Sequence, residues 1–86
     1  MRKIVEEVSG EGLVKLLGER VTLLCANYFY TGKLIGVDNT CALLEDPYII
    51  YETGPWSDAK WKDAQSLCTK TWYVQLRFIE SFGVTK

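Results

Sequence analysis

Four polar residues have side chains that can bind nucleotides: Asp38, Asn39 and Thr40, which follow one another between two apolar runs, and Arg77 in a later apolar run. Carboxylate and amide groups bind the edges of bases, and an arginine beside them contacts a base or a phosphate. The same residues also have structural interpretations. Asp-Asn is a common turn sequence, and Arg77 could instead form an ion pair with Asp38 or Glu80.

Two other segments bring aromatic residues together, and the second of them also carries lysines. They supply six further candidate contacts: Tyr28, Phe29, Trp56, Lys60, Trp61 and Lys62. Aromatic rings stack on unpaired bases and lysines attract phosphates, which is the composition of a single-strand binding surface. Alternatively, the tyrosine and the phenylalanine pack in a core or a subunit interface. The later segment would then be a lid helix that tucks Trp61 onto the fold and leaves its lysines in solvent.

The composition argues against an enzyme and against a metalloprotein. The chain of 86 residues has no histidine, and its three cysteines form no Cys-x-x-Cys pair. A zinc site of the usual kind is therefore not expected, and a Ser-His or Cys-His nucleophile cannot be built in one chain. For the carboxylates Glu45, Asp46 and Glu52, a solvated rim or a subunit salt bridge is expected. We expect no catalytic residues, no metal site and no cofactor.

Charge and hydropathy restrict the partners and the compartment. The net charge is −1, which weighs against nucleic-acid binding because phosphate contacts come mainly from Lys and Arg. A local basic rim can still occur on an acidic protein. No apolar stretch approaches the roughly 18 residues of a membrane span, and no signal peptide is visible. With its cysteines expected to be reduced, the sequence predicts a cytoplasmic protein without a membrane partner.

A short amphipathic helix is predicted near the start of the chain. Between residues 9 and 18, leucines fall at helical spacing, Ser9 can cap the first turn and Gly18 suits the end. The expected helix has about two to three turns because the segment between these two signals is short.

From Val21 the apolar pattern changes to the alternation that is typical of strands. The three expected strands cover residues 21–26, 28–37 and 41–52. Gly32 and Gly36 inside the second strand predict a strong bend, because glycine tolerates bulges and close backbone approach. Pro47 lacks an amide donor, so it is expected at an edge or a bend.

A helical insertion over about residues 54–70 is predicted between the third strand and the last one. A Gly-Pro pair ends the strand, Ser57 can cap a helix, and apolar residues follow at helical spacing. Alternation returns over residues 72–79, so Arg77 is expected within a strand, on the face that also carries Tyr73.

This order of elements and one motif resemble the Sm-like (LSm) family, in which a helix precedes a bent five-stranded antiparallel barrel. The first motif of the family is a glycine in the second strand, five residues, an aspartate and an apolar strand. Here it reads Gly32, KLIGV, Asp38 and NTCALL, with spacing similar to that of the bacterial Hfq branch. The second motif matches in part, since Leu76-Arg77 precedes Phe78 where Sm proteins have glycine.

The resemblance implies one mainly β domain over residues 1–86: a short N-terminal helix, then a small Sm-like (SH3-like) barrel with the insertion. It also implies a homo-oligomeric ring, because open strand edges of neighbouring subunits pair. In such a ring Asp38, Asn39, Thr40 and Arg77 would line a pore and bind RNA or single-stranded DNA without catalysis. The alternative is an oligomeric β-barrel interaction module that binds a protein or a small apolar ligand and no nucleic acid.

Overall fold

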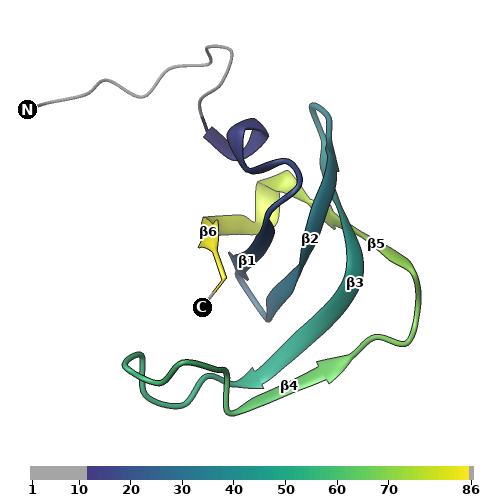
Figure 1. Ribbon diagram of the computed structural model, residues 1–86. Helices are drawn as coiled ribbons and strands as arrows, with labels where there is room; N and C mark the ends of the chain where they lie inside the picture. Colours follow the sequence, from purple (N-terminus) through teal and green to yellow (C-terminus); the bar gives the residue numbers. More distant parts are fainter. Residues whose placement is uncertain (1–11, 86) are drawn as a thin grey trace, which may run out of the picture.

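The computed structural model describes residues 12–85, which form one antiparallel β-sheet (Figure 1). In chain order the elements are η1 (Gly12–Leu16), β1 (Arg20–Cys25), β2 (Phe29–Val37), β3 (Cys41–Glu52), β4 (Asp63–Ser66), β5 (Thr71–Gln75), η2 (Leu76–Phe78) and β6 (Ile79–Val84). Both η elements are short 3-10 helices, and the described residues contain no α-helix. The prediction of a mainly β fold is therefore confirmed.

The six strands form one sheet that does not close into a barrel. The strand order is β4-β3-β2-β1-β6, and β5 also pairs with β3. Within the described residues β5 and β6 share no ladder, so each of them keeps one open edge. The structure thus differs from the predicted five-stranded barrel, because it has six strands and an open side between β5 and β6.

The bend of β2 arises at its two glycines. The register between β2 and β3 shifts between Thr31 and Lys33, around Gly32, and again between Leu34 and Gly36. A Cβ atom at Gly32 would lie 3.0 Å from the Cβ of Leu44 and 3.1 Å from the carbonyl oxygen of Glu45. A side chain at Gly32 would therefore require its neighbours in β3 to shift, in keeping with the close backbone approach predicted for this glycine.

β3 changes partner at Pro47. The first half of β3 pairs with β5 and the second half with β4, and the residue before the proline, Asp46, has a φ of 51°. The N–H of Asp46 donates to the Lys70 carbonyl (3.0 Å), and the N–H of Leu67 donates to the Pro47 carbonyl (3.0 Å). Arg20 holds the bend, since its guanidinium donates to the Asp46 carbonyl (3.1 Å) and lies 3.6 Å from the Asp46 carboxylate. The proline lies at a bend, as predicted.

The core lies inside the curled sheet and draws on most of its strands. Alternate residues of the strands supply it, in keeping with the period of two. The buried cluster comprises Val21, Leu23, Cys25, Leu34, Ala42, Leu44 and Val74. Leu13 and Leu16 of η1 pack against this cluster, whereas Leu17 is exposed, so two of the three leucines of the N-terminal segment face the core.

The predicted helix over residues 9–18 is wrong in type and length where the structure describes it. Residues 9–11 lie outside the described part, and η1 is a 3-10 segment of five residues. Gly12 has a φ of 70° and Gly18 has a φ of 89°, both in the left-handed region. Two to three α-turns do not fit between these glycines. Neither described helix is long and apolar enough to cross a membrane.

The helical insertion predicted at 54–70 is also wrong. The chain forms a loop over 53–62, and β4 then pairs with the second half of β3, with Ala64 opposite Ile50. A short isolated helix is marginal in water, whereas the open edge of β3 offers backbone hydrogen bonds. The helical spacing of Trp61, Ala64 and Leu67 is therefore overridden by strand pairing.

The strand predicted over 72–79 is divided by η2. β5 ends at Gln75 as a partner of β3, whereas β6 begins at Ile79 as a partner of β1. This change of partner requires a change of direction, which the 3-10 turn of η2 supplies. Arg77 therefore lies in η2 and not within the strand that the alternation predicts.

Candidate nucleic-acid interface

The turn between β2 and β3 is built around the carboxylate of Asp38. Its Oδ1 accepts hydrogen bonds from the backbone N–H groups of Thr40 (2.7 Å) and Cys41 (2.8 Å) and from the Thr40 hydroxyl (3.0 Å). The N–H of Asp38 donates to the Cys41 carbonyl (3.0 Å). Hydrogen bonds to the charged carboxylate hold the pKa of Asp38 below its usual value. Asp38 therefore shapes the turn, which is the structural role that Asp-Asn sequences often have.

η2 brings Arg77 to this turn. The N–H of Leu76 donates to the Thr40 carbonyl (2.9 Å), and the β3–β5 ladder reaches the same point. A surface pocket of about 480 Å³ lies between the two segments, and we name it the turn pocket. It is lined by Asn39, Thr40, Cys41, Gln75, Leu76 and Arg77. Three of the four predicted nucleotide-binding residues thus share one pocket, and Asp38 fixes the turn beside it.

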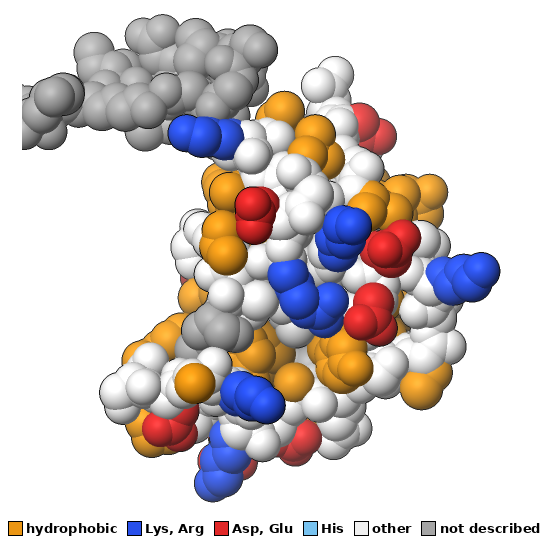
Figure 2. All heavy atoms as spheres, in the orientation of Figure 1, with side chains coloured by type: hydrophobic (Ala, Val, Ile, Leu, Met, Phe, Trp, Pro, Cys, Tyr) orange, Lys and Arg blue, Asp and Glu red, His pale blue; other side chains and the backbone are white. Residues whose placement is uncertain are grey.

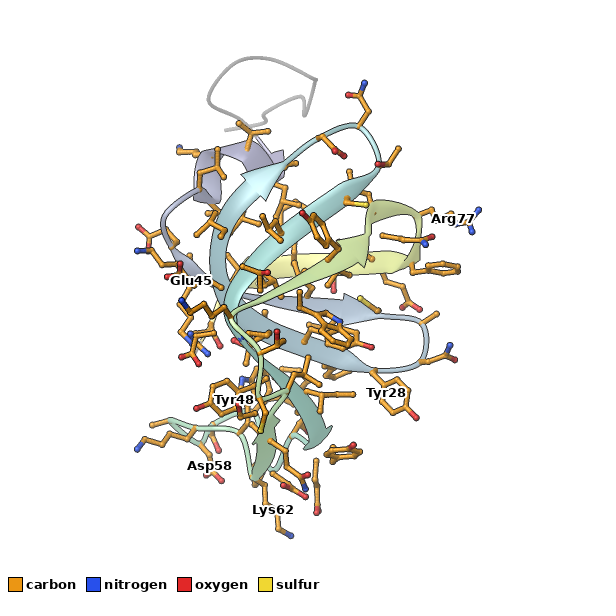
Figure 3. The ribbon with its side chains drawn as sticks, turned by 90° about the vertical axis from the view of Figure 1, so that its right-hand side faces the viewer. Tyr28, Glu45, Tyr48, Asp58, Lys62 and Arg77 are labelled. Atoms are coloured by element: carbon orange, nitrogen blue, oxygen red, sulfur yellow. The ribbon has the colours of Figure 1, made fainter. Side chains whose placement is uncertain are left out.

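Arg77 projects away from the sheet (Figure 3). Its Nε donates to the side-chain oxygen of Gln75 (3.1 Å), and its Cζ lies 4.9 Å from the centroid of the Phe78 ring. The predicted alternative, an ion pair with Asp38 or Glu80, is not formed. Neutral groups hold the guanidinium, and no described carboxylate lies within salt-bridge distance of it. Its charge is therefore available to an anion.

Other basic side chains lie among carboxylates. Arg20 lies 3.6 Å from Asp46, and Lys33 lies opposite Glu45 in the β2–β3 ladder. Figure 2 shows basic and acidic side chains beside one another on the face of the molecule that it draws. One chain therefore offers few phosphate contacts from this face, so a polyanion needs other contacts or several subunits.

Tyr28 and Phe29 have different surroundings. Phe29 is half-buried in β2 opposite Leu24 and Ile50, which is a packing role. Tyr28 is exposed and packs edge-to-face on Tyr51, with ring centroids 6.4 Å apart. Tyr28 also lines a second pocket of about 340 Å³, which we name the aromatic pocket. Of the two residues, only Tyr28 is placed to contact a ligand there.

Sequence reasoning missed most of the aromatic pocket. Its rings are Tyr28, Tyr30, Trp72, Tyr73 and Phe78. The last three come from β5 and η2, where the alternation pattern indicates only a strand. The signal that could have found them is a strand rich in aromatic residues that has one open edge, because such an edge leaves rings at the surface.

The insertion tryptophans lie beside β1 and β6 and line one groove with them. The indole N–H of Trp61 donates to the Thr85 hydroxyl (3.3 Å), and its ring is half-buried. Trp56 packs edge-to-face with Trp61, with ring centroids 5.5 Å apart, and is 62% exposed. Trp61 therefore has the packing role that the structural alternative predicts, on a loop instead of a helix.

The insertion lysines do not join Arg77 in one basic surface. Lys60 and Lys62 are both exposed, and Lys62 lies 3.1 Å from Glu52. Figure 3 shows Lys62 and Arg77 on separate parts of the molecule. The predicted contacts of the β2–β3 turn and η2 thus lie at the turn pocket, and the predicted lysine and tryptophan contacts lie in the insertion. They do not form one continuous site.

The cysteines have no metal-binding arrangement in the part of the chain that the structure describes. No group of three or more possible ligands among its Cys, Asp and Glu residues could hold a metal ion. Cys25 is buried, Cys41 is half-buried and Cys68 is exposed, and all three are free. Burial, and then the charge of Glu80, raise the pKa of the Cys25 thiol. Cys25 is therefore protonated at neutral pH and is a poor nucleophile.

Comparison of the chain with family models, with curated proteins and with solved structures gives no match. The functional argument therefore rests on the geometry of this chain and on the resemblance carried by Gly32, Asp38 and Leu76-Arg77. Both resembling motifs meet at the turn pocket, which makes this pocket the first candidate for function.

Proposed function

We propose that this protein is a non-enzymatic, Sm-like protein of the cytoplasm that assembles into a homo-oligomeric ring and binds single-stranded RNA or DNA at the turn pocket. The observation that carries the proposal is the hydrogen bond from Leu76 to Thr40 (2.9 Å). It joins the two segments that carry the family resemblance. Because of it, one pocket holds an amide, a hydroxyl and a guanidinium from distant parts of the sequence.

The groups that line the turn pocket suit an unpaired nucleotide. The amide of Asn39 donates and accepts hydrogen bonds at a base edge, and Arg77 binds a phosphate or stacks on a base. The Thr40 hydroxyl donates to Asp38 and so offers its lone pairs to a ligand. Asp38 is a positioning residue, since its carboxylate is engaged by the turn. Gln75 orients Arg77 through its side-chain oxygen.

Self-association is supported by the open edges of β5 and β6. Each strand has one partner in the sheet of the described residues, and exposed apolar side chains accompany these edges. They include Phe82 and Val84 of β6. Because the two edges differ, pairing β5 of one subunit with β6 of the next is heterologous and forms a ring where the rotation closes. A ring would repeat Arg77 around an axis and multiply the phosphate contacts.

The test is a titration of fluorescently labelled single-stranded RNA at about 50 mM and about 200 mM salt. Light scattering on the same samples records the oligomeric mass. We expect a ring whose affinity for RNA falls roughly tenfold between the two salts, as two or three phosphate contacts from the Arg77 side chains of neighbouring subunits predict. A ring that binds RNA at neither salt would overturn the binding function, and a monomer that binds RNA would overturn the assembly.

A second candidate function is an oligomeric module that binds a protein or a small apolar ligand and no nucleic acid. The observation that favours it is a groove of about 370 Å³ whose lining includes Trp56, Trp61 and Phe82. This function predicts no RNA binding at either salt and a change in tryptophan emission when an apolar probe is added. A Trp56→Phe variant assigns that change to the groove or to the other tryptophans.

A further inference from the structure

The aromatic pocket lies on the open side of the sheet and is a separate site. It shares only Gln75 with the turn pocket. Its walls come from the turn between β1 and β2, from β5 and from η2. Its volume of about 340 Å³ is at the small end of the range for ligand sites, so a compact group fits it better than an extended one.

Strand pairing explains why aromatic rings meet here. Trp72 of β5 lies opposite the core residue Leu44. Because β5 has no second partner within the described residues, Trp72 stays 40% exposed at the margin of the core. Tyr73 is 68% exposed at the same strand. Tyr28 closes the pocket from the β1–β2 turn and is held by its edge-to-face contact with Tyr51.

The charge around the aromatic pocket favours a cation. No lysine, arginine, aspartate or glutamate of the described residues lines it. Two ionisable groups in its lining, Cys25 and Tyr30, have pKa values above their usual values, first because of burial. The charge of Glu80 also raises the pKa of Cys25, whereas a nearby cation would lower it. The carboxylate of Glu80 therefore acts at the Cys25 wall of the pocket, whereas the guanidinium of Arg77 lies over the Phe78 ring, with its Cζ 4.9 Å from the ring centroid.

We propose that the aromatic pocket binds a quaternary or methylated ammonium group. Aromatic faces attract such cations electrostatically, and the methyl groups pack against the rings at a small cost in desolvation. Five rings from the β1–β2 turn, β2, β5 and η2 supply the surface, and the carboxylate of Glu80, whose charge acts on the lining residue Cys25, adds attraction. The proposal does not depend on nucleic-acid binding at the turn pocket, because the two pockets have different linings apart from Gln75.

Titration with choline, followed through the NMR shift of the Trp72 indole, tests the proposal. The matched control ligand is 3,3-dimethylbutanol, which has the same shape and no charge. We expect choline to bind roughly tenfold more tightly or better, because several rings contribute to cation–π attraction. Equal affinity for both ligands would overturn the proposal, since it would show an apolar pocket without a preference for charge.

Two variants locate the binding site. Tyr73→Ala removes one exposed ring and should weaken choline binding by roughly 2- to 30-fold. Glu80→Gln keeps the size of the side chain and removes only its charge, so it tests the site even where truncation disturbs β5. It should weaken choline binding at low salt and have less effect at high salt. Trp56→Ala removes an exposed ring outside the pocket and should leave the affinity unchanged. Unchanged affinity in both pocket variants would contradict the proposal.

A free ammonium compound and a methylated lysine of a protein share this chemistry. Competition between choline and a short peptide that contains trimethyllysine separates the two sources. Tighter binding of the peptide indicates that the ligand of the aromatic pocket is a methylated lysine of a protein. Tighter binding of choline indicates that it is a small ammonium compound. Binding of a mononucleotide at the Trp72 indole without any binding of choline would overturn the proposal and assign the pocket to a base.

Discussion

The turn pocket and the insertion both carry residues that the sequence predicts as nucleic-acid contacts, but the fold anchors them differently. In the turn pocket, backbone atoms fix the geometry: Leu76 donates to the Thr40 carbonyl (2.9 Å), and the Asp38 carboxylate accepts two backbone N–H groups (2.7 and 2.8 Å). In the insertion, the N–H of Lys62 donates to the Thr53 carbonyl (3.3 Å) and shapes the loop, and the Trp61 indole donates to the Thr85 hydroxyl (3.3 Å). The turn is therefore fixed through backbone atoms and the Asp38 carboxylate, which leaves its other side chains free for a ligand, whereas the insertion uses its tryptophan to pack against the C-terminal segment.

The largest expected effect is a loss of stability from a substitution at the contact between β2 and β3, which supports both regions. Both are connected to β3, and β3 packs tightly against β2 at Gly32. We expect Gly32→Val to lower the free energy of unfolding by roughly 2–3 kcal/mol, because the new side chain meets Leu44 and the Glu45 backbone. Urea denaturation measures this loss, and RNA affinity should fall with it.

The matched control is Gly83→Ala in β6. Nothing lies within 4 Å of a Cβ atom at Gly83, so its free energy of unfolding should stay within about 0.5 kcal/mol of the wild type. Equal stability of the Gly32→Val variant and this control would show that the close approach of β2 and β3 does not support the two regions.

A smaller loss of stability is expected from a substitution that changes the insertion and leaves the turn pocket intact. Trp61→Phe removes the indole hydrogen bond to Thr85 and should lower the free energy of unfolding by about 1 kcal/mol. RNA affinity should not change, because Trp61 packs the loop and lies outside the turn pocket. The same urea and RNA titrations measure both quantities. A tenfold loss of RNA affinity in a folded Trp61→Phe protein would place the insertion within the binding site.

The smallest expected effect is the pH dependence of the turn. The pKa of Asp38 is lowered from 3.8 in the folded protein, first by its backbone hydrogen bonds. Its stabilising contribution is therefore complete above the unfolded-state pKa and is lost as the pH falls through the lower folded-state pKa. The melting temperature of the wild type should exceed that of Asp38→Asn at about pH 6, and the difference should narrow towards about pH 3. A constant difference would contradict the role of the carboxylate in the turn.

The parts of the fold that depend on local sequence are predictable. Alternation over residues 21–26 and runs of β-prone and apolar residues over 28–37 and 41–52 identify the first three strands, because each of these signals needs only neighbouring residues. Gly32 and Gly36 predict the bend of β2, and Pro47 predicts the bend of β3, since each restricts or frees its own backbone. For the same reason, Asp38, Asn39 and Thr40 are recognisable as a polar turn.

The remaining parts depend on pairing between distant segments. Trp61, Ala64 and Leu67 fit a helix, but the open edge of β3 recruits β4 from this segment. Arg77 leaves its predicted strand because the chain must pass from β3 to β1. Trp72 belongs to a pocket only because β5 has one partner. The candidate residues of the turn pocket could thus be named from the sequence, but their meeting at one pocket could not.

The most direct test of the central claim is a comparison of two charge deletions in RNA binding. Fluorescence anisotropy at about 50 mM salt measures the affinity of the wild type, Arg77→Ala and Lys70→Ala for labelled single-stranded RNA. Lys70 is exposed and lies outside the turn pocket, so both variants lose one positive charge and only one loses a pocket group. We predict a loss of about tenfold or more for Arg77→Ala and less than about twofold for Lys70→Ala. Equal losses in the two variants, or no binding by any of the three proteins, would contradict nucleic-acid binding at the turn pocket.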